Sequence, residues 1–261
     1  RLANRMQRYA VQHSRLGIPL FLAEEAPHGH MAIGATTFPT APGQASTWNP
    51  ELIERMGEVI AAEIRLQGGH ICYGPVLDIV RDPRWSRTEE SYGEDRYLTA
   101  RIGEAYVRGT GSGDLSQPRH ALSTLKHFIA YGASEGGQNG GNNLLGEREL
   151  RETYLPPFEA AVKAGARSVM TAYNSVDGIP CTANRRMLTD ILRGEWGFEG
   201  MVTTDWYTHA PQYTEIAAGN DVKMGCGDPA HTLKMMREGK LSREDVKTSV
   251  KRLLEMILKL A

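Results

Sequence analysis

The chain has 261 residues, a formal net charge of −1 and 41% hydrophobic residues, which suits one domain with a substantial core. Charges of both signs are interspersed, which argues against nucleic acid or a membrane surface as partner, and no apolar run is long enough to cross a bilayer. The three cysteines are scattered and lack metal-ligand spacing, so we expect free thiols in a reducing compartment, with the cytoplasm favoured. The chain begins at Arg1 without a signal-like segment, and we expect it to be a piece of a longer polypeptide.

Helix and strand signals alternate along the chain. The hydrophobic pattern predicts helices at 2–15, 50–67, 96–109, 147–164, 185–195, 229–238 and 242–260. It predicts strands at 18–23, 70–73, 121–125, 168–171, 200–204 and 221–224. Asn49-Pro50 is a helix start, and Ser242–Asp245 is a capping pattern. Pro156-Pro157 indicates a kink or a fresh start within its helix.

Strands separated by helices predict parallel pairing through right-handed crossovers. No dinucleotide-binding glycine pattern follows the first strand, and the Gly-rich segment 132–146 lacks the Lys-Ser/Thr of a phosphate loop. We therefore predict an α/β fold of the (β/α)8 TIM-type barrel class rather than an open doubly wound sheet. Because only six strands are visible, we expect the barrel to be incomplete at its N-terminus. Such a barrel would expose apolar surface, which allows a homo-oligomer.

In a barrel of this type the chemistry lies at the carboxyl ends of the strands. The residues expected there are Glu25, Asp78, Arg87 with Glu90, Lys126-His127, Tyr173-Asn174 and Asp205-Trp206. Each has a purely structural alternative: Asp205 can cap the next helix, and Arg87 with Glu90 can be an ion pair without a catalytic role. Together they supply carboxylate, guanidinium, ammonium, imidazole and aromatic groups. Such a set suits a neutral polyol, whose hydroxyls need donors and acceptors in fixed positions.

Six motifs follow one another in the order and at the approximate spacing of a known family, within a resemblance that runs from about Ile18 to Gly225. They are GPVLD at 74–78, RDPRW at 81–85, RTEESYGED at 87–95, KHF at 126–128, MTAYN at 170–174 and TTDW at 203–206. In this order they resemble glycoside hydrolase family 3. The resemblance implies an exo-acting retaining β-glucosidase or β-xylosidase, which acts on an oligosaccharide or β-glycoside without metal or organic cofactor. It also implies that residues 1–261 are the barrel domain alone, with an α/β sandwich domain of the same polypeptide as its partner.

The family pattern assigns roles to individual residues of this chain. Asp205 matches the catalytic nucleophile, which attacks the anomeric carbon and forms a covalent glycosyl-enzyme intermediate. The residues that match sugar contacts in the −1 subsite are Arg87, Lys126, His127 and Tyr173, with Trp206 stacking against the ring.

This chain departs from the family pattern at three places. Glu25 stands where glucosidases commonly have Asp, and its extra methylene would crowd a C6 hydroxymethyl group, so xylose is an alternative to glucose. Gln138 stands where many relatives place Arg or Lys as a further sugar contact. The general acid/base of most of the family lies on the sandwich domain, and Glu135 is the nearest candidate within the chain. The loop KHFIAYG differs from that of the β-N-acetylglucosaminidase branch, which disfavours that branch.

A hypothesis from another class remains. The chain can also be read as a non-catalytic sugar-binding or structural barrel, which would bind saccharides weakly and hydrolyse none.

Overall fold

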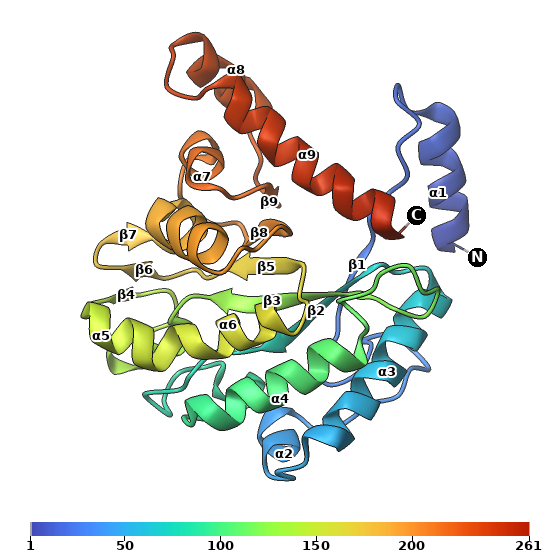
Figure 1. Cartoon of the computed structure of the whole chain (residues 1–261). Coiled ribbons are helices and arrows are strands. Elements are labelled where there is room, and N and C mark those ends of the chain that lie inside the picture. The colour runs from blue at the N-terminus through green and yellow to red at the C-terminus, as the bar shows by residue number, and fades with distance from the viewer. Residues whose placement is uncertain (1, 261) are drawn as a thin grey trace.

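A curled sheet of six parallel strands organises residues 2–260, the part of the chain that the computed structural model describes (Figure 1). The strands are β1 (Ala23–Glu25), β2 (Ile71–Val76), β3 (Leu122–Phe128), β5 (Ser168–Thr171), β8 (Met201–Trp206) and β9 (Val222–Met224). They lie side by side in chain order, and every neighbouring pair is parallel. Between 2 and 260, β9 and β1 do not pair with each other, so the sheet is a barrel wall that is open between them. The predicted TIM-type barrel is confirmed as a partial barrel.

Helices connect successive strands, as right-handed parallel crossovers require. The connecting helices are α3 (Pro50–Gln67), α4 (Arg96–Gly109), α6 (Leu155–Lys163), the π-helix η6 (Arg186–Glu195) and α7 (Gln212–Ala218). In Figure 1 α3, α4 and α6 lie together along one face of the sheet. Outside the strand series lie α1 (Leu2–His13), which buries none of its residues, α8 (Pro229–Arg237) and α9 (Arg243–Leu260).

Shorter helical turns and strands lie within the segments that connect the strands of the main sheet. They are α2 (Ala41–Ala45), α5 (Glu147–Glu149), the π-turn η4 (Leu150–Tyr154), the 3-10 turns η1 (Thr88–Glu90), η2 (Tyr131–Ala133), η3 (Glu135–Gly137) and η5 (Cys181–Ala183), and the strands β4 (Asn142–Asn143), β6 (Ser175–Val176) and β7 (Ile179–Pro180). The last three strands form a small separate sheet, which the hydrophobic pattern did not predict because two-residue strands have no readable period.

Local sequence signals account for several element boundaries. The Asn49 side chain accepts a hydrogen bond from the Leu52 amide at 3.0 Å, which caps α3 as predicted. Ser242 Oγ accepts from the Asp245 amide at 3.0 Å at the start of α9. The helical run from α5 through η4 to α6 is continuous, and the prolines after Leu155 follow directly on the π-helical turn η4, so they mark an irregularity within one helix rather than a fresh start.

The first strand lies later than predicted. The apolar run at 18–22 is extended but largely unpaired, whereas pairing with β2 begins at Ala23. Its hydrophobicity serves packing instead, because Phe21 contacts the cluster on the inner face of the sheet. The strands β3 and β8 also run further than predicted, so that Lys126 and Asp205 are strand residues rather than loop residues.

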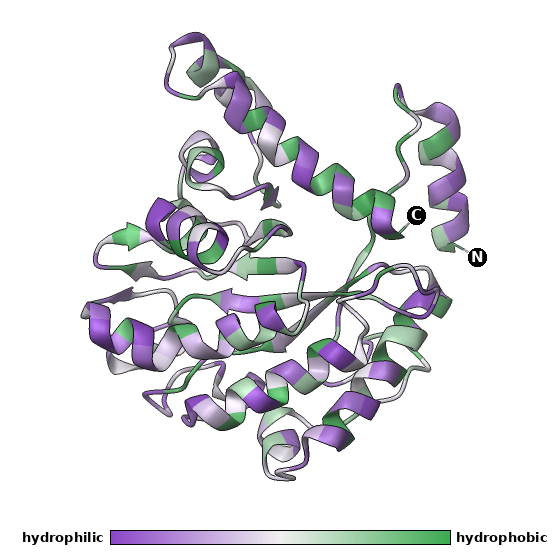
Figure 2. Ribbon diagram, viewed as in Figure 1, coloured by the Kyte–Doolittle hydropathy of each residue, from purple (hydrophilic) through white to green (hydrophobic). Residues whose placement is uncertain are grey.

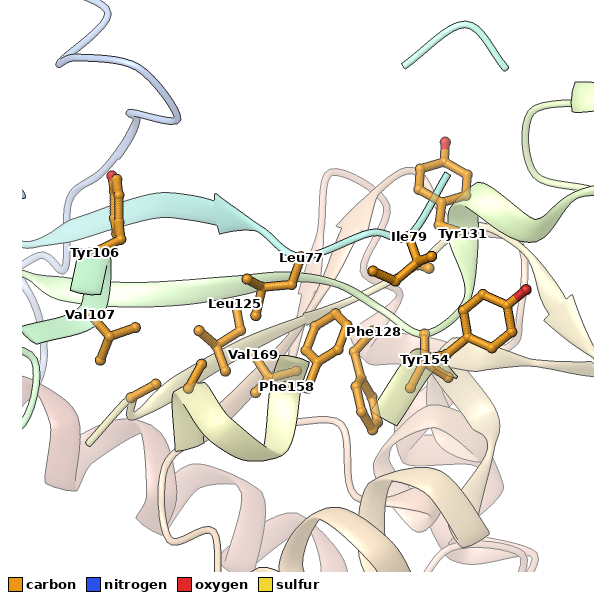
Figure 3. Close-up of a cluster of buried hydrophobic side chains, with 14 of the residues drawn as sticks. Leu77, Ile79, Tyr106, Val107, Leu125, Phe128, Tyr131, Tyr154, Phe158 and Val169 are labelled. Atoms are coloured by element: carbon orange, nitrogen blue, oxygen red, sulfur yellow. The ribbon is translucent and has the colours of Figure 1, made fainter. Parts of the chain in front are cut away.

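Alternation along the strands divides the core between the two faces of the sheet. Cys72, Leu125 and Val169 point toward the connecting helices, where Tyr106 and Phe158 complete the larger cluster (Figure 3). The other cluster lies on the inner face. It contains Ile71, Tyr73, Leu122, Met170, Met201 and Met224, together with Met256 and Leu260 from α9. The helices carry hydrophobic and hydrophilic stripes that match this division (Figure 2).

A buried carboxylate joins three elements at the amino end of β9. Asp221 accepts hydrogen bonds from Arg193 Nη2 at 2.9 Å, from Arg252 Nη1 at 3.1 Å and from the Val202 amide at 2.8 Å. Burial raises the pKa of Asp221, and the two arginines oppose that rise. The Asp221 carboxylate therefore links η6, β8 and α9 through hydrogen bonds, at the end of the sheet opposite to the carboxyl ends of the strands.

None of the helices between residues 2 and 260 combines the length and the apolar character that a membrane span requires.

Candidate active site

The register of the sheet brings the predicted residues to one edge. Glu25 pairs with Tyr73, Val76 pairs with Lys126, and Thr171 pairs with Thr204. The residues at or just beyond these positions therefore meet at the carboxyl ends of β1, β2, β3, β5 and β8. The sequence prediction that strand ends carry the site is consistent with this placement.

Asp205 occupies the centre of the group, and its side chain is 8% exposed. Its Oδ1 accepts a hydrogen bond from the Trp206 amide at 2.7 Å. Its Oδ2 lies 3.5 Å from His127 Nε2 and 3.6 Å from Arg87 Nη1. Within the described residues this Oδ2 is buried and has no hydrogen-bond partner. The carboxylate is thus fixed through one oxygen and leaves the other oxygen available.

Arg87 is held from two sides. Its Nε and Nη2 donate to the two carboxylate oxygens of Glu90, each at 2.7 Å, and its Cζ lies 5.4 Å from the centre of the Tyr131 ring. Burial opposes the charge of Arg87, but the bonds to Glu90 outweigh it and raise the pKa of the guanidinium. The structural ion pair considered from the sequence therefore exists, and it aims the remaining nitrogen of Arg87 at Asp205.

Lys126 and Glu25 form an ion pair on the side of the site where β1 lies. Lys126 Nζ donates to Glu25 Oε2 at 2.7 Å, with side-chain exposures of 3% for the lysine and 42% for the glutamate. Both residues line a cavity of about 330 Å³. The other lining residues are Pro27, His28, Met31, Thr40, Arg87, Glu89 and Glu90. The cavity therefore adjoins Asp205 through Arg87 and presents charged donors and acceptors to a ligand.

His127 connects Asp205 to a second, deeper carboxyl group. Its Nδ1 lies 2.7 Å from Asp78 Oδ2, and its backbone N–H lies 3.3 Å from each Asp78 oxygen. Both side chains are buried. Burial raises the pKa of Asp78 to about 8 and lowers the pKa of His127 well below its usual range. Both shifts disfavour a charged carboxylate–imidazolium pair.

Two aromatic residues complete the group around Asp205. Burial, and then the negative charge of Asp205, raise the pKa of the Tyr173 hydroxyl, which places that hydroxyl in the electrostatic reach of the carboxylate. Trp206 is 45% exposed at the end of β8, so an indole face is open at the rim of the site. An exposed indole beside a buried carboxylate suits contact with the apolar face of a sugar ring.

The loop that carries Glu135 and Gln138 runs beside this cluster, since Asn139 accepts a hydrogen bond from Trp85 Nε1 at 3.2 Å. Glu135 and Gln138 are both exposed in and after η3. Within the described part of the chain, neither side chain has a hydrogen bond to the residues around Asp205. The role of Gln138 as a sugar contact therefore stays a prediction.

One central residue has no distinguishing signal in the sequence. Tyr131 is fully buried, and its ring centre lies 5.1 Å from Trp85, 5.1 Å from His127 and 5.9 Å from Tyr173. The Tyr131 ring packs against the Arg87 guanidinium and against the His127 ring. Only its position three residues after the end of β3 hints at the site, and position alone does not distinguish a supporting ring from an ordinary core ring.

No group of three or more histidine, cysteine, aspartate or glutamate side chains between residues 2 and 260 is arranged to hold a metal ion. The chemistry that the arrangement itself offers is attack by a carboxylate on an electron-poor carbon, beside donors that can bind hydroxyl groups.

Comparison with known proteins places this arrangement in a family. The model of the glycosyl hydrolase family 3 N-terminal domain matches residues 1–256. A β-xylosidase from Formosa agariphila is 45% identical over 210 residues, which cover 77% of this chain and 29% of that protein. A β-glucosidase from Rhizobium radiobacter is 36% identical over 254 residues, which cover 93% of this chain and 30% of that protein.

Solved structures agree with the sequence relatives. A mutant β-glucosidase from Listeria innocua in complex with laminaribiose superposes with a TM-score of 0.93 at 35% identity, and the match covers 99% of this chain and 37% of that chain. The chain thus spans about a third of the length of the proteins it matches. The family model, the sequence relatives and the shared fold agree, and the chain belongs to glycosyl hydrolase family 3, in which it corresponds to the N-terminal domain.

Proposed function

We propose that this chain is the nucleophile-bearing domain of a retaining, exo-acting β-glycosidase that removes terminal non-reducing β-D-glucose. Asp205 attacks the anomeric carbon while the bond from that carbon to the leaving oxygen breaks, and a covalent glycosyl-enzyme intermediate forms. Water then hydrolyses the intermediate, so the released sugar keeps its β configuration.

One observation supports the nucleophile assignment above the others. Asp205 Oδ2 is buried, has no hydrogen-bond partner within the described residues, and faces Arg87 and His127 at 3.6 and 3.5 Å. Buried polar atoms are nearly always hydrogen-bonded, so an unpartnered carboxylate oxygen at such a place needs an explanation. A substrate carbon or hydroxyl that occupies this position supplies one. A helix cap does not, because no helix begins beside Asp205 and its Oδ1 bonds only the Trp206 amide.

The remaining residues of the site bind the sugar in this proposal. Lys126, Glu25 and Arg87 line the cavity and offer both donors and acceptors to the sugar hydroxyls. Trp206 stacks on the ring, and Tyr173 donates toward Asp205 or the ring oxygen. The displacement uses side-chain chemistry throughout and needs no metal or organic cofactor.

The general acid/base is assigned to an α/β sandwich domain of the same polypeptide. A retaining mechanism needs a second carboxyl group about 5–5.5 Å from the first. Glu25 and Glu90 are each occupied by an ion pair at 2.7 Å, with Lys126 and Arg87, so neither is free to give a proton to a leaving group. This chain covers 29% of the β-xylosidase relative and 37% of the β-glucosidase structure, so those proteins are long enough to hold another domain. The barrel alone then works slowly, because general acid–base catalysis typically contributes about 10²–10⁴-fold.

A β-xylosidase of the same family is the second candidate. Glu25 reaches into the cavity to bond Lys126, which narrows the space for a C6 hydroxymethyl group that xylose lacks. The β-xylosidase named among the relatives is 45% identical to this chain. Activity on an aryl β-glucoside and on an aryl β-xyloside distinguishes the two candidates.

Azide rescue tests the nucleophile in the complete polypeptide. Asp205→Gly should lose about 10³-fold or more of its turnover on an aryl β-glucoside. Added azide should then attack the anomeric carbon from the vacated face and give the α-glycosyl azide, with release of the aryl alcohol. Asp190→Asn, at an exposed position on η6, is the matched control and should keep full activity.

Each outcome decides the proposal. Covalent labelling of Asp205 by a 2-fluoroglycoside, together with azide rescue, supports it. A label on another residue, or an Asp205→Asn variant with undiminished turnover, refutes the nucleophile assignment. Saccharide binding without hydrolysis of either aryl β-glucoside or aryl β-xyloside by the complete polypeptide favours the non-catalytic barrel.

A further inference from the structure

Two buried polar atoms face each other in the site without a hydrogen-bond partner. His127 Nε2 and Asp205 Oδ2 lie 3.5 Å apart, and within the described residues neither has a hydrogen bond, although Arg87 Nη1 lies 3.6 Å from the same carboxylate oxygen. If Asp205 is a carboxylate, its oxygen can only accept. An imidazole lone pair at Nε2 would then place two acceptors against each other in a buried place, which is costly. The geometry therefore requires a hydrogen on Nε2.

The other ring nitrogen decides whether Nε2 carries that hydrogen. A neutral imidazole has one N–H, so Nε2 is protonated only when Nδ1 accepts a hydrogen bond. The partner of Nδ1 is Asp78 Oδ2 at 2.7 Å, and a carboxyl group can donate to Nδ1 only when it carries a proton. Asp78 is also anchored by the His127 backbone N–H, so the two side chains keep a fixed relative position.

We infer that Asp78 is a positioning residue whose protonated carboxyl group donates to His127 Nδ1, and that this bond fixes the tautomer in which Nε2–H points at Asp205 and the substrate. In this form the imidazole donates to a sugar hydroxyl beside the carboxylate. When Asp78 ionises, Nδ1–H donates to Asp78 instead, Nε2 becomes an acceptor, and that donor is lost. The inference rests on the proposed function for its role in catalysis, but the tautomer itself does not.

The surroundings of the pair favour the uncharged form. Burial of both side chains raises the pKa of Asp78 to about 8 and lowers that of His127, and each shift opposes a charged carboxylate–imidazolium pair. The titratable and charged groups that face the pair are Arg87 just before η1, Glu90 from η1, Lys126 from β3, Tyr131 from η2, Cys181 from η5 and Asp205 from β8. Arg87 favours ionised Asp78, yet its charge is shared with Glu90.

The pH dependence of the first chemical step tests the role in catalysis. The substrate is a dinitrophenyl β-glycoside, whose leaving group needs no protonation, so the general acid of another domain does not affect the profile. For the unmodified polypeptide, kcat/KM should fall by about fivefold between pH 8 and pH 9 as Asp78 ionises.

Two variants separate the tautomer from simple packing. Asp78→Asn has an amide that always donates to Nδ1, so kcat/KM at pH 7 should stay within about threefold and the alkaline fall should disappear. Asp78→Ala leaves Nδ1 without a donor and should lose about 10- to 100-fold in kcat/KM at every pH. Asp190→Asn should keep the original profile. If Asp78→Asn keeps the alkaline fall, or loses activity as Asp78→Ala does, the inference is wrong.

Infrared difference spectroscopy gives a readout that does not depend on activity. The unmodified polypeptide should show the carbonyl stretch of a protonated buried carboxyl group at pH 7, and the band should vanish as pH rises through about 8. The band should be missing in Asp78→Asn. Absence of the band from the unmodified polypeptide overturns the inference even if no variant folds. If the band is present and no glycoside is hydrolysed, the tautomer stands and the proposed function fails.

Discussion

Shortening Glu25 by one methylene tests whether Glu25 sets the preference of the proposed site between glucose and xylose. In the structure Glu25 Oε2 accepts from Lys126 Nζ at 2.7 Å, and both residues line the cavity beside Asp205. Glu25→Asp withdraws the carboxylate by about 1.5 Å, the length of one carbon–carbon bond. The change therefore opens room for a C6 hydroxymethyl group and stretches the ion pair at the same time.

The two effects act differently on the two sugars. The weaker bond to Lys126, which is nearly buried, affects both sugars and should lower kcat/KM for each by about tenfold, in line with about 1.5 kcal/mol for a hydrogen bond to a charged group. The added room benefits glucose alone. One methylene of pocket space is worth about 1 kcal/mol or more, so the ratio of kcat/KM for glucoside over xyloside should rise about fivefold.

The assay compares aryl β-glucoside and aryl β-xyloside with the same leaving group, at substrate concentrations well below KM. Glu24→Asp is the matched control, because neighbouring strand residues point to opposite faces of the sheet and Glu24 lies outside the cavity. That control should leave the ratio unchanged. A ratio in Glu25→Asp that is unchanged or shifted toward xyloside would refute the assignment of Glu25 as the residue that limits space at C6.

Two further predictions concern stability and sugar binding. Asp221→Ala should lower the free energy of unfolding by about 3–5 kcal/mol in a denaturant titration, because it leaves the largely buried Arg193 and Arg252 without their carboxylate partner. Glu152→Ala, which breaks an exposed ion pair within a helix, should lower it by about 0.5 kcal/mol or less. Equal losses in the two variants would contradict this reasoning. Trp206→Ala should raise KM about tenfold if its exposed indole, next to Asp205 in the chain, stacks on the sugar. Trp48→Ala, at an exposed tryptophan just before α3, should leave KM unchanged. An unchanged KM in Trp206→Ala would exclude stacking.

The fold was predictable because its elements are long and strongly patterned. The helix at 96–109 and the strand at 168–171 have the predicted bounds, since each has a clear hydrophobic face or core and a clear boundary signal. The first strand was placed too early because an apolar run can serve packing without pairing, as Phe21 does. The two-residue strands of the small sheet were missed, because they depend on long-range pairing and not on local pattern.

The gathering of several charged residues at one edge was predictable, whereas their roles stay predictions. His127 on β3 and Arg87 in the loop after β2 both lie near Asp205 on β8, because parallel strands bring their carboxyl ends to one edge. The support beneath them was less visible. Tyr131 resembles any buried aromatic residue in the sequence, and its contacts with Arg87 and His127 exist only in three dimensions. Asp78 was noted at its strand end, but its bond to His127 spans 49 residues and has no local signature.

The distribution of the site over the sheet has a consequence for how such proteins diversify. Glu25 lies on β1, a three-residue strand that pairs on one side only, whereas Asp205 lies on β8, which pairs on both sides. A substitution on the edge strand disturbs few neighbours, while one on the interior strand disturbs two. Under the proposed function, a substitution at Glu25 can change the preference between sugars at little cost to the fold, while the strands on both sides of β8 hold the Asp205 carboxylate in place.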